Sequence, residues 1–185
     1  MLAAGHRPGR NTMDVFEAIR RRRSVRNFTG DPVVAADLEK IVAAGIEAPS
    51  GCNMQLRQYV IVDAPAVMDN LRPLSGAIDG APAAIVLLVD PQATKYGEFW
   101  IQDASAAMEN MLLAAEALGY GACWVEGALR RCEETLRELL GVPANLRVWS
   151  LMSVGRAAKT PPRPQKSEFA QVVHRNRFGE RFRNA

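Results

Sequence analysis

The chain has 185 residues, 48% hydrophobic and 23% charged, which is enough for one domain with a substantial core. Its formal net charge is only +3 and 6% of its residues are aromatic, which disfavours a nucleic-acid binder, since such proteins carry a large basic excess or a basic stripe with interleaved aromatic rings. No apolar run is long enough to cross a bilayer, so we expect no membrane association.

The chain begins with a short segment, residues 1–12, that is rich in Gly, Pro and Arg and lacks the apolar run of a secretory signal. We expect a flexible leader there and a single domain over residues 13–185. Asn11 or Thr12 can cap a first helix that ends near Arg22. Four consecutive arginines lie at the end of this helix, where cations complement the negative end of the helix dipole.

The next elements follow from hydrophobic periodicity. Residues 34–46 repeat apolar side chains at helical spacing, and Pro49 requires the helix to stop before it. Two short apolar runs, residues 58–63 and 83–90, predict buried strands, with a weak helix at residues 64–71 between them. The first half of the chain therefore predicts two helices, then a strand, a helix and a strand.

The second half begins with a strongly apolar helix. Residues 103–118 are apolar on nearly all sides and end at Gly119, which predicts a core helix. The elements expected after it are a strand at 122–125, a helix at 132–140 and a strand at 147–154. Prolines keep the segment after Gly155 extended. The element order predicts an α+β fold with a small mixed β-sheet flanked by helices, and the apolar helix indicates burial by a partner subunit.

Cysteine and histidine usage constrains the compartment and the metal content. Cys52, Cys123 and Cys132 form an odd set without C-x-x-C spacing, which predicts free thiols in a reducing, cytoplasmic compartment. His6 and His174 lie far apart in the sequence, so we expect no metal site.

The first candidate site is the basic segment at residues 22–26. Guanidinium groups and a hydroxyl lie together at a helix end, and this set matches the geometry of a phosphate. A solvated cationic helix end is the simpler alternative. The candidate residues are Arg22, Arg23, Ser24 and Arg26.

The second candidate is the segment APSGCNMQ at residues 48–55, where proline and glycine force an irregular loop. Its two amide side chains suit a ligand with alternating donors and acceptors, such as a flavin or a nucleobase, although an ordinary turn is equally compatible. Cys52 has no basic partner in the sequence, so we interpret it as a small thiol and not a nucleophile. The candidate residues are Pro49, Ser50, Gly51, Asn53 and Gln55.

Two further positions are weaker candidates. Gly127, which follows Glu126 at a strand end, would let a backbone N–H approach a flat ligand closely. The preceding glycines lack the G-x-G-x-x-G pattern of a dinucleotide site. Arg163 lies in a proline-rich arm, where it could reach a phosphate or remain exposed. Pro161 and Pro164 also have the PxxP spacing of a peptide ligand.

Together these stretches occur in the order of a known family. From about Met13 to Phe178 the chain resembles the FMN-dependent nitroreductase family. Four motifs carry the likeness: RRSVRNF at 22–28, APSGCNMQ at 48–55, DASAAMENMLLAAEALGYGACW at 103–124 and G…RP…H at 155–174. The resemblance implies a nitroreductase-like fold and a homodimer with FMN at the subunit interface. It also implies that the C-terminal arm, residues 155–185, is exchanged between subunits.

The resemblance also implies residue roles. The phosphate contacts fall on Arg22, Arg23 and Ser24, with Arg163 as a further contact, while Arg26 meets the polar edge of the flavin. Gln165 stands where some members have a second arginine, which implies a weaker grip on the phosphate. The implied contacts to the flavin ring are Pro49, Ser50, Gly51, Asn53 and Gln55, with Glu126 and Gly127 near flavin N5. The sequence Gln55-Leu56-Arg57 departs from the family's usual Gln-Pro-aromatic.

By this resemblance we expect an NAD(P)H-dependent oxidoreductase that reduces nitroaromatic or quinone-like acceptors through bound FMN by a ping-pong mechanism. FMN carries the hydride, so no catalytic residue is expected from the protein. Two alternatives stay open. One is a related enzyme with other flavin chemistry, such as dehalogenation, enoate reduction or flavin cleavage. The other is a non-catalytic FMN-binding module.

Overall fold

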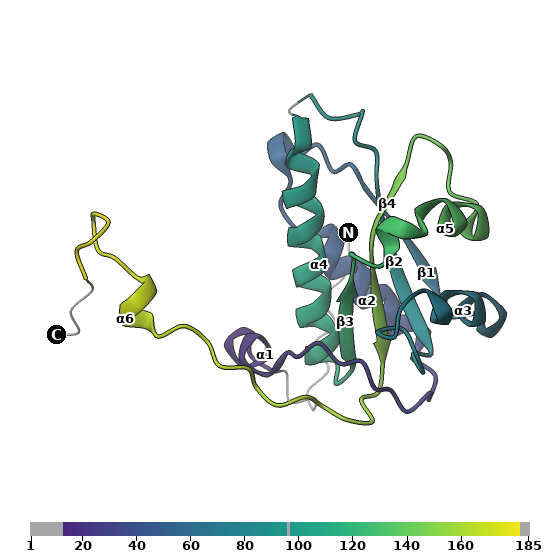
Figure 1. Ribbon diagram of the computed structural model, residues 1–185, viewed down its shortest axis with the longest axis horizontal. Helices are drawn as coiled ribbons and strands as arrows, with labels where there is room; N and C mark the ends of the chain where they lie inside the picture. Colours follow the sequence, from purple (N-terminus) through teal and green to yellow (C-terminus); the bar gives the residue numbers. More distant parts are fainter. Residues whose placement is uncertain (1–12, 96, 182–185) are drawn as a thin grey trace, which may run out of the picture.

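A four-stranded sheet with helices on both faces forms the body of the molecule, and a long arm extends from it toward the C-terminus (Figure 1). The computed structural model describes residues 13–95 and 97–181. The expected leader at residues 1–12, with the expected cap at Asn11 or Thr12, lies outside the described residues.

The sheet has the strand order β1-β2-β4-β3, and every pair of neighbouring strands is antiparallel. The sequence predicts a mixed sheet. The structure restricts parallel pairing, within the described residues, to an isolated bridge between Ser24 and Ala122 at the edge of β3. The bounds are β1 (Arg57–Val62), β2 (Ala83–Val89), β3 (Gly121–Val125) and β4 (Arg147–Gly155). The predicted strands thus form at the predicted apolar runs.

Six α-helices accompany the sheet in the described ranges. They are α1 (Val15–Arg21), α2 (Ala35–Ile46), α3 (Pro65–Leu71), α4 (Trp100–Ala117), α5 (Glu133–Leu140) and α6 (Phe169–Val172). The observed cap of α1 is Asp14, whose Oδ1 accepts hydrogen bonds from the backbone N–H of Phe16 (2.7 Å) and Glu17 (3.2 Å). Helix α4 begins three residues before the predicted start, and α6 lies in a segment predicted to be extended.

Strand β2 separates two apolar clusters. All its residues are buried, which agrees with its continuous apolar sequence, because a strand covered on both faces needs apolar side chains on both. Helices α2 and α4 cover one face and α3 and α5 cover the other (Figure 1). Gly45 in α2 allows the close approach of α4, since a Cβ there would lie 2.8 Å from Cγ of Met111.

The arm leaves the sheet after β4 and passes α1 before it extends away from the domain (Figure 1). Within this arm Phe169, Val172 and Phe178 remain 57%, 58% and 92% exposed. Phe16 on α1 is 76% exposed as well. Several of the large apolar side chains that are exposed therefore lie on α1 and along the arm.

Three further properties bear on the expectations from the sequence. All three cysteines have free thiols. No helix in the described ranges combines the length and the apolarity that a bilayer crossing requires. Residues 13–95 and 97–181 also contain no group of three or more His, Cys, Asp or Glu side chains placed to hold a metal ion.

Candidate functional site

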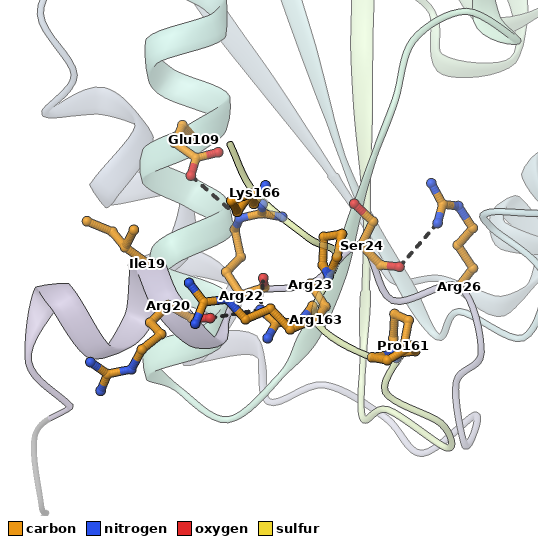
Figure 2. A pocket seen from close by; sticks show the side chains of 12 residues that line it. Ile19, Arg20, Arg22, Arg23, Ser24, Arg26, Glu109, Pro161, Arg163 and Lys166 are labelled. Carbon is orange, nitrogen blue, oxygen red and sulfur yellow. Dashed lines mark hydrogen bonds and ion pairs between the residues drawn. The ribbon is translucent and has the colours of Figure 1, made fainter. Parts of the chain in front are cut away.

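A pocket with a volume of about 710 Å³ lies between the end of α1, the segment that follows it and the proline-rich arm (Figure 2). It brings together predicted cofactor-binding residues from two distant parts of the chain. Those that line it are Arg22, Arg23, Ser24, Arg26 and Arg163. The arrangement supports the prediction that these two basic segments act on one ligand.

The end of helix α1 fixes the first arginines of this pocket. The helix ends at Arg21, and Nη1 of Arg23 donates to the backbone carbonyls of Arg20, Arg21 and Arg22, each at 2.8 Å. Carbonyl groups at the end of a helix have no N–H partner within the helix. The Arg23 guanidinium supplies donors to these carbonyls and so serves as a C-terminal cap. Arg23 therefore has a structural role beside any contact to a ligand.

Glu109 of α4 is the carboxylate in the pocket lining. Its Oε1 lies 3.5 Å from Nε of Arg22, and Figure 2 shows this ion pair between α4 and the segment after α1. The lining contains six cationic side chains against this one carboxylate. Because the excess charge is positive, the pocket favours an anion.

Ser24 is held in place by the sheet. Its neighbour Val25 is buried and donates its N–H to the carbonyl of Ala122 at 2.9 Å, which lays the segment along β3. The close approach depends on Gly121, because a Cβ at this position would lie 2.8 Å from the Val25 side chain. Arg26 follows on the exposed side, with Nη1 donating to the Ser24 carbonyl at 3.3 Å.

Sequence reasoning missed two cations of the pocket. The sequence indicates only a helix-end cation at Arg20. This residue lies in the last turn of α1, as expected, and it also lines the pocket. Its guanidinium points away from Arg22 in Figure 2. Lys166 lines the pocket from the arm, whereas the predicted Gln165 does not.

Burial raises the pKa of the Cys123 thiol, and the positive charges of Arg26 and Arg22 act in the opposite direction. Cys123 lies in β3, behind the segment that carries these arginines. A buried thiol with a raised pKa stays protonated at neutral pH, so Cys123 is not a nucleophile.

The second predicted site, the loop before β1, has a strained backbone. Cys52, Asn53 and Gln55 have positive φ angles of 49°, 55° and 51°, a region that costs non-glycine residues about 1 kcal/mol or more each. Hydrogen bonds hold this conformation: the Gly51 N–H donates to Oδ1 of Asp103 at 2.9 Å, and Nε2 of Gln55 donates to Oδ1 of Asn53 at 2.8 Å. Strain of this kind is typical of loops with a binding role.

The guanidinium of Arg57 stabilises the same loop through hydrogen bonds to backbone carbonyls. Its side chain is buried, with 9% of the residue exposed, and Nη2 donates to the carbonyl of Ala48 at 2.7 Å. Its Nη1 donates to the carbonyls of Pro49 (3.2 Å) and Asp103 (3.0 Å). This guanidinium, at the position where the resemblance predicts an aromatic residue, ties the loop to α4.

The loop and the cationic pocket lie at different levels of α4. The loop bonds to Asp103 and the pocket to Glu109, six residues or about 9 Å further along the helix. Gly51 lines a separate, smaller cavity of about 270 Å³ together with Met54 and Phe99. One chain therefore does not bring the predicted loop residues, Pro49, Ser50, Gly51, Asn53 and Gln55, into the cationic pocket.

Glu126 and Gly127 directly follow β3, as predicted, but they do not line the cationic pocket. Oε1 of Glu126 accepts a hydrogen bond from Arg130 at 2.7 Å. No atom lies within 4 Å of the position of a Cβ at Gly127, so the backbone there is open to close approach.

Comparison with known proteins supplies independent information. The family model described as "Nitroreductase family" matches residues 19–78 and 72–156. An Archaeoglobus fulgidus protein with the provisional name NADH dehydrogenase/NAD(P)H nitroreductase is 39% identical over 151 residues, covering 77% of this chain and 84% of its own length. The Vibrio harveyi NADPH-flavin oxidoreductase is 28% identical over 182 residues, covering 90% of this chain and 75% of its own.

Solved structures agree with these matches. A protein from Desulfovibrio desulfuricans, provisionally described as a nitroreductase and solved in complex with FMN, superposes with a TM-score of 0.79 at 31% identity, covering 89% of this chain and 97% of its own. The FMN-dependent nitroreductase from Clostridium difficile superposes with a TM-score of 0.76 at 28% identity, covering 87% and 98%. The observed architecture is thus that of these proteins.

Proposed function

Because the chain belongs to the nitroreductase family, we propose that it is an NAD(P)H-dependent flavin oxidoreductase that binds FMN and reduces nitroaromatic or quinone-like acceptors. The observation that carries the proposal is the cationic pocket, in which Arg22, Ser24 and Arg163 face one space. A phosphate monoester carries close to two negative charges at neutral pH, and arginine forks match its geometry.

The residues of the pocket fit the phosphate of FMN. Within the described ranges the Arg163 guanidinium has no hydrogen-bond or ion-pair partner, and Arg22 has only the Glu109 contact at 3.5 Å. Both side chains therefore retain donors for a ligand. Arg23 would add the donors that its capping role leaves free, and Arg26 would face the polar edge of the ring system.

We propose that the flavin ring lies between two subunits. The loop that holds Asn53 and Gln55 faces another cavity in its own chain, so its amides reach a ring bound at the cationic pocket only from a second copy. The exposed Phe16, Phe169 and Phe178 support a homodimer in which each arm covers the partner, because burial of these large apolar side chains against a second subunit would remove them from water.

FMN, when bound, supplies hydride transfer through N5, and the chain supplies position and electrostatic field. The open backbone at Gly127 suits a ring edge, while the Arg26 cation favours negative charge at the opposite edge. Donor and acceptor would use one cleft in turn, which corresponds to ping-pong kinetics.

We further propose that residues 13–185 act as one FMN-binding domain in the cytoplasm, a location that the three free thiols support.

The first experiment is reconstitution of the purified protein with FMN, FAD or riboflavin, followed by anaerobic addition of NADH or NADPH. We expect tight binding of FMN and bleaching of its visible absorbance without an acceptor, then recovery of absorbance on addition of a quinone. Bound FMN that neither nucleotide bleaches would favour a non-catalytic flavin-binding module. Parallel lines in double-reciprocal plots would establish the ping-pong order, and intersecting lines would contradict it.

A matched pair of variants tests the phosphate site. Arg22→Ala should weaken FMN binding by about 1.5–3 kcal/mol, the value of a charge-assisted hydrogen bond. Arg20→Ala should have little effect, because its guanidinium points away from the pocket centre. Equal losses in the two variants would contradict the assignment.

Truncation after Thr160 should abolish both dimerisation and FMN binding, and a truncated monomer that retains FMN would argue against the exchanged arm.

A further inference from the structure

The proline-rich part of the arm imposes its own periodicity on the side chains. Prolines at 161, 162 and 164 fix φ near −65°, and the residues before them, including Arg163, are restricted to extended conformations. Successive residues of this kind form a polyproline II helix with three residues per turn. Side chains three positions apart therefore share an edge, whereas side chains two positions apart do not.

Arg163 and Lys166 are three positions apart, and both line the cationic pocket. Gln165, two positions after Arg163, does not line it. Lys166 lines this pocket together with Arg22 and Glu109, and Figure 2 shows Arg163 turned toward the end of α1. Like Arg163, the Lys166 ammonium has no hydrogen-bond or ion-pair partner among the residues that the structure describes.

We infer that Lys166, and not Gln165, is the second contact of the arm to the phosphate of FMN. This inference rests on the proposed function and refines its phosphate site. Gln165, where the resemblance puts the second arginine of some members, does not line the pocket, and the next residue supplies a cation there. The ammonium is a point charge on a flexible stem, so it needs no fixed fork to reach a phosphate oxygen.

The position of Glu109 increases the effect of a further cation on a bound anion. Its carboxylate already pairs with Arg22, which reduces the positive charge available to a ligand at that point. Lys166 lines the same pocket and adds one positive charge to it. The weaker phosphate grip expected from Gln165 is therefore compensated within the same arm.

The test compares affinities for FMN and riboflavin, which differ only in the phosphate. Both flavins are titrated by fluorescence quenching into the full-length wild type and the variants Lys166→Gln, Gln165→Ala and the exchange variant Gln165→Lys/Lys166→Gln. Lys166→Gln should raise the Kd of FMN on the order of tenfold and leave that of riboflavin unchanged. Gln165→Ala should stay within twofold of wild type, and the exchange variant should bind like Lys166→Gln.

A Lys166→Gln variant with wild-type FMN affinity, or an exchange variant that recovers it, would overturn the inference. Equal weakening of both flavins would also overturn it, since that result indicates a structural effect and not a phosphate contact. Wild-type protein that binds neither flavin would overturn the proposed function and this inference with it. If the wild type binds FMN and Lys166→Gln binds it with the same affinity, the inference is overturned and the proposed function stands.

Discussion

Replacement of Arg57 by methionine tests whether the guanidinium holds the loop before β1. The variant keeps an apolar stem but removes three hydrogen bonds, to the carbonyls of Ala48, Pro49 and Asp103. Bonds to a charged donor contribute about 1.5–3 kcal/mol each, but the cost of burying an uncompensated guanidinium opposes them. About 1 kcal/mol per bond remains, so we expect a loss of about 3 kcal/mol in the free energy of unfolding.

For a chain of this length, 1 kcal/mol corresponds to about 2–4 °C in Tm, so the variant should melt about 6–12 °C below wild type. Arg57→Lys should lower the free energy of unfolding by about two thirds of the loss expected for Arg57→Met, since one ammonium cannot span three carbonyls. Gln58→Ala, at the next and exposed position of β1, is the control and should change stability by less than about 0.5 kcal/mol.

Urea unfolding followed by fluorescence gives the free energies, and FMN titration reports on the loop itself. We expect FMN affinity to fall in Arg57→Met, because the strained backbone at Cys52 and Asn53 loses its anchor to α4. A variant that unfolds within 0.5 kcal/mol of wild type and binds FMN equally well would refute the anchoring role.

Two further predictions concern the sheet. Gly121→Ala should cost about 1–3 kcal/mol of stability and also weaken FMN binding, because the new Cβ would lie 2.8 Å from Val25 and displace the segment that carries Ser24. Gly76→Ala, where no atom lies within 4 Å, is its control, and equal behaviour of the two variants in urea and flavin titrations would contradict the packing argument. The hydrogen bond to Arg147 lowers the pKa of Glu133, so its stabilising contribution is present above the unfolded glutamate pKa of about 4.3 and lost as pH falls through the lower folded value. Glu133→Gln should therefore flatten the decline of stability between about pH 5 and pH 3, and an unchanged slope in acid urea titrations would exclude this ion pair as a cause.

Local sequence predicted the elements well because their causes are local. The apolar run at residues 83–90 became β2 at Ala83–Val89, and Gly119 closely follows the end of α4. The start of α4 was predicted late because Trp100, 8% exposed, packs into the core without a capping signal before it. The strand order and its antiparallel pairing depend on contacts between distant residues, so periodicity alone could not give them.

The same distinction applies to the site. The arginines at residues 22–26 are adjacent in sequence, so the pattern made them candidates, and the resemblance to a family favoured a phosphate site over a solvated helix end. The roles of Glu109 and Arg57 arise from contacts with residues far along the chain, for example between Arg57 and Asp103, and no local pattern indicates them. Lys166 had a weak signal in its three-residue spacing from Arg163, which a polyproline II helix continued beyond Pro164 would place on the same edge.

The complete burial of β2 has a consequence for hydrogen exchange. Both faces of this strand are covered, and both edges are bonded, to β1 and to β4. Its amide protons can reach solvent only when the whole domain opens, so a peptide from β2 reports the global free energy of unfolding in deuterium uptake. Peptides from the arm lie outside this protection, and their uptake would measure the coverage that the proposed second subunit provides. One mass-spectrometric time course therefore separates the stability of the domain from the occupancy of its arm.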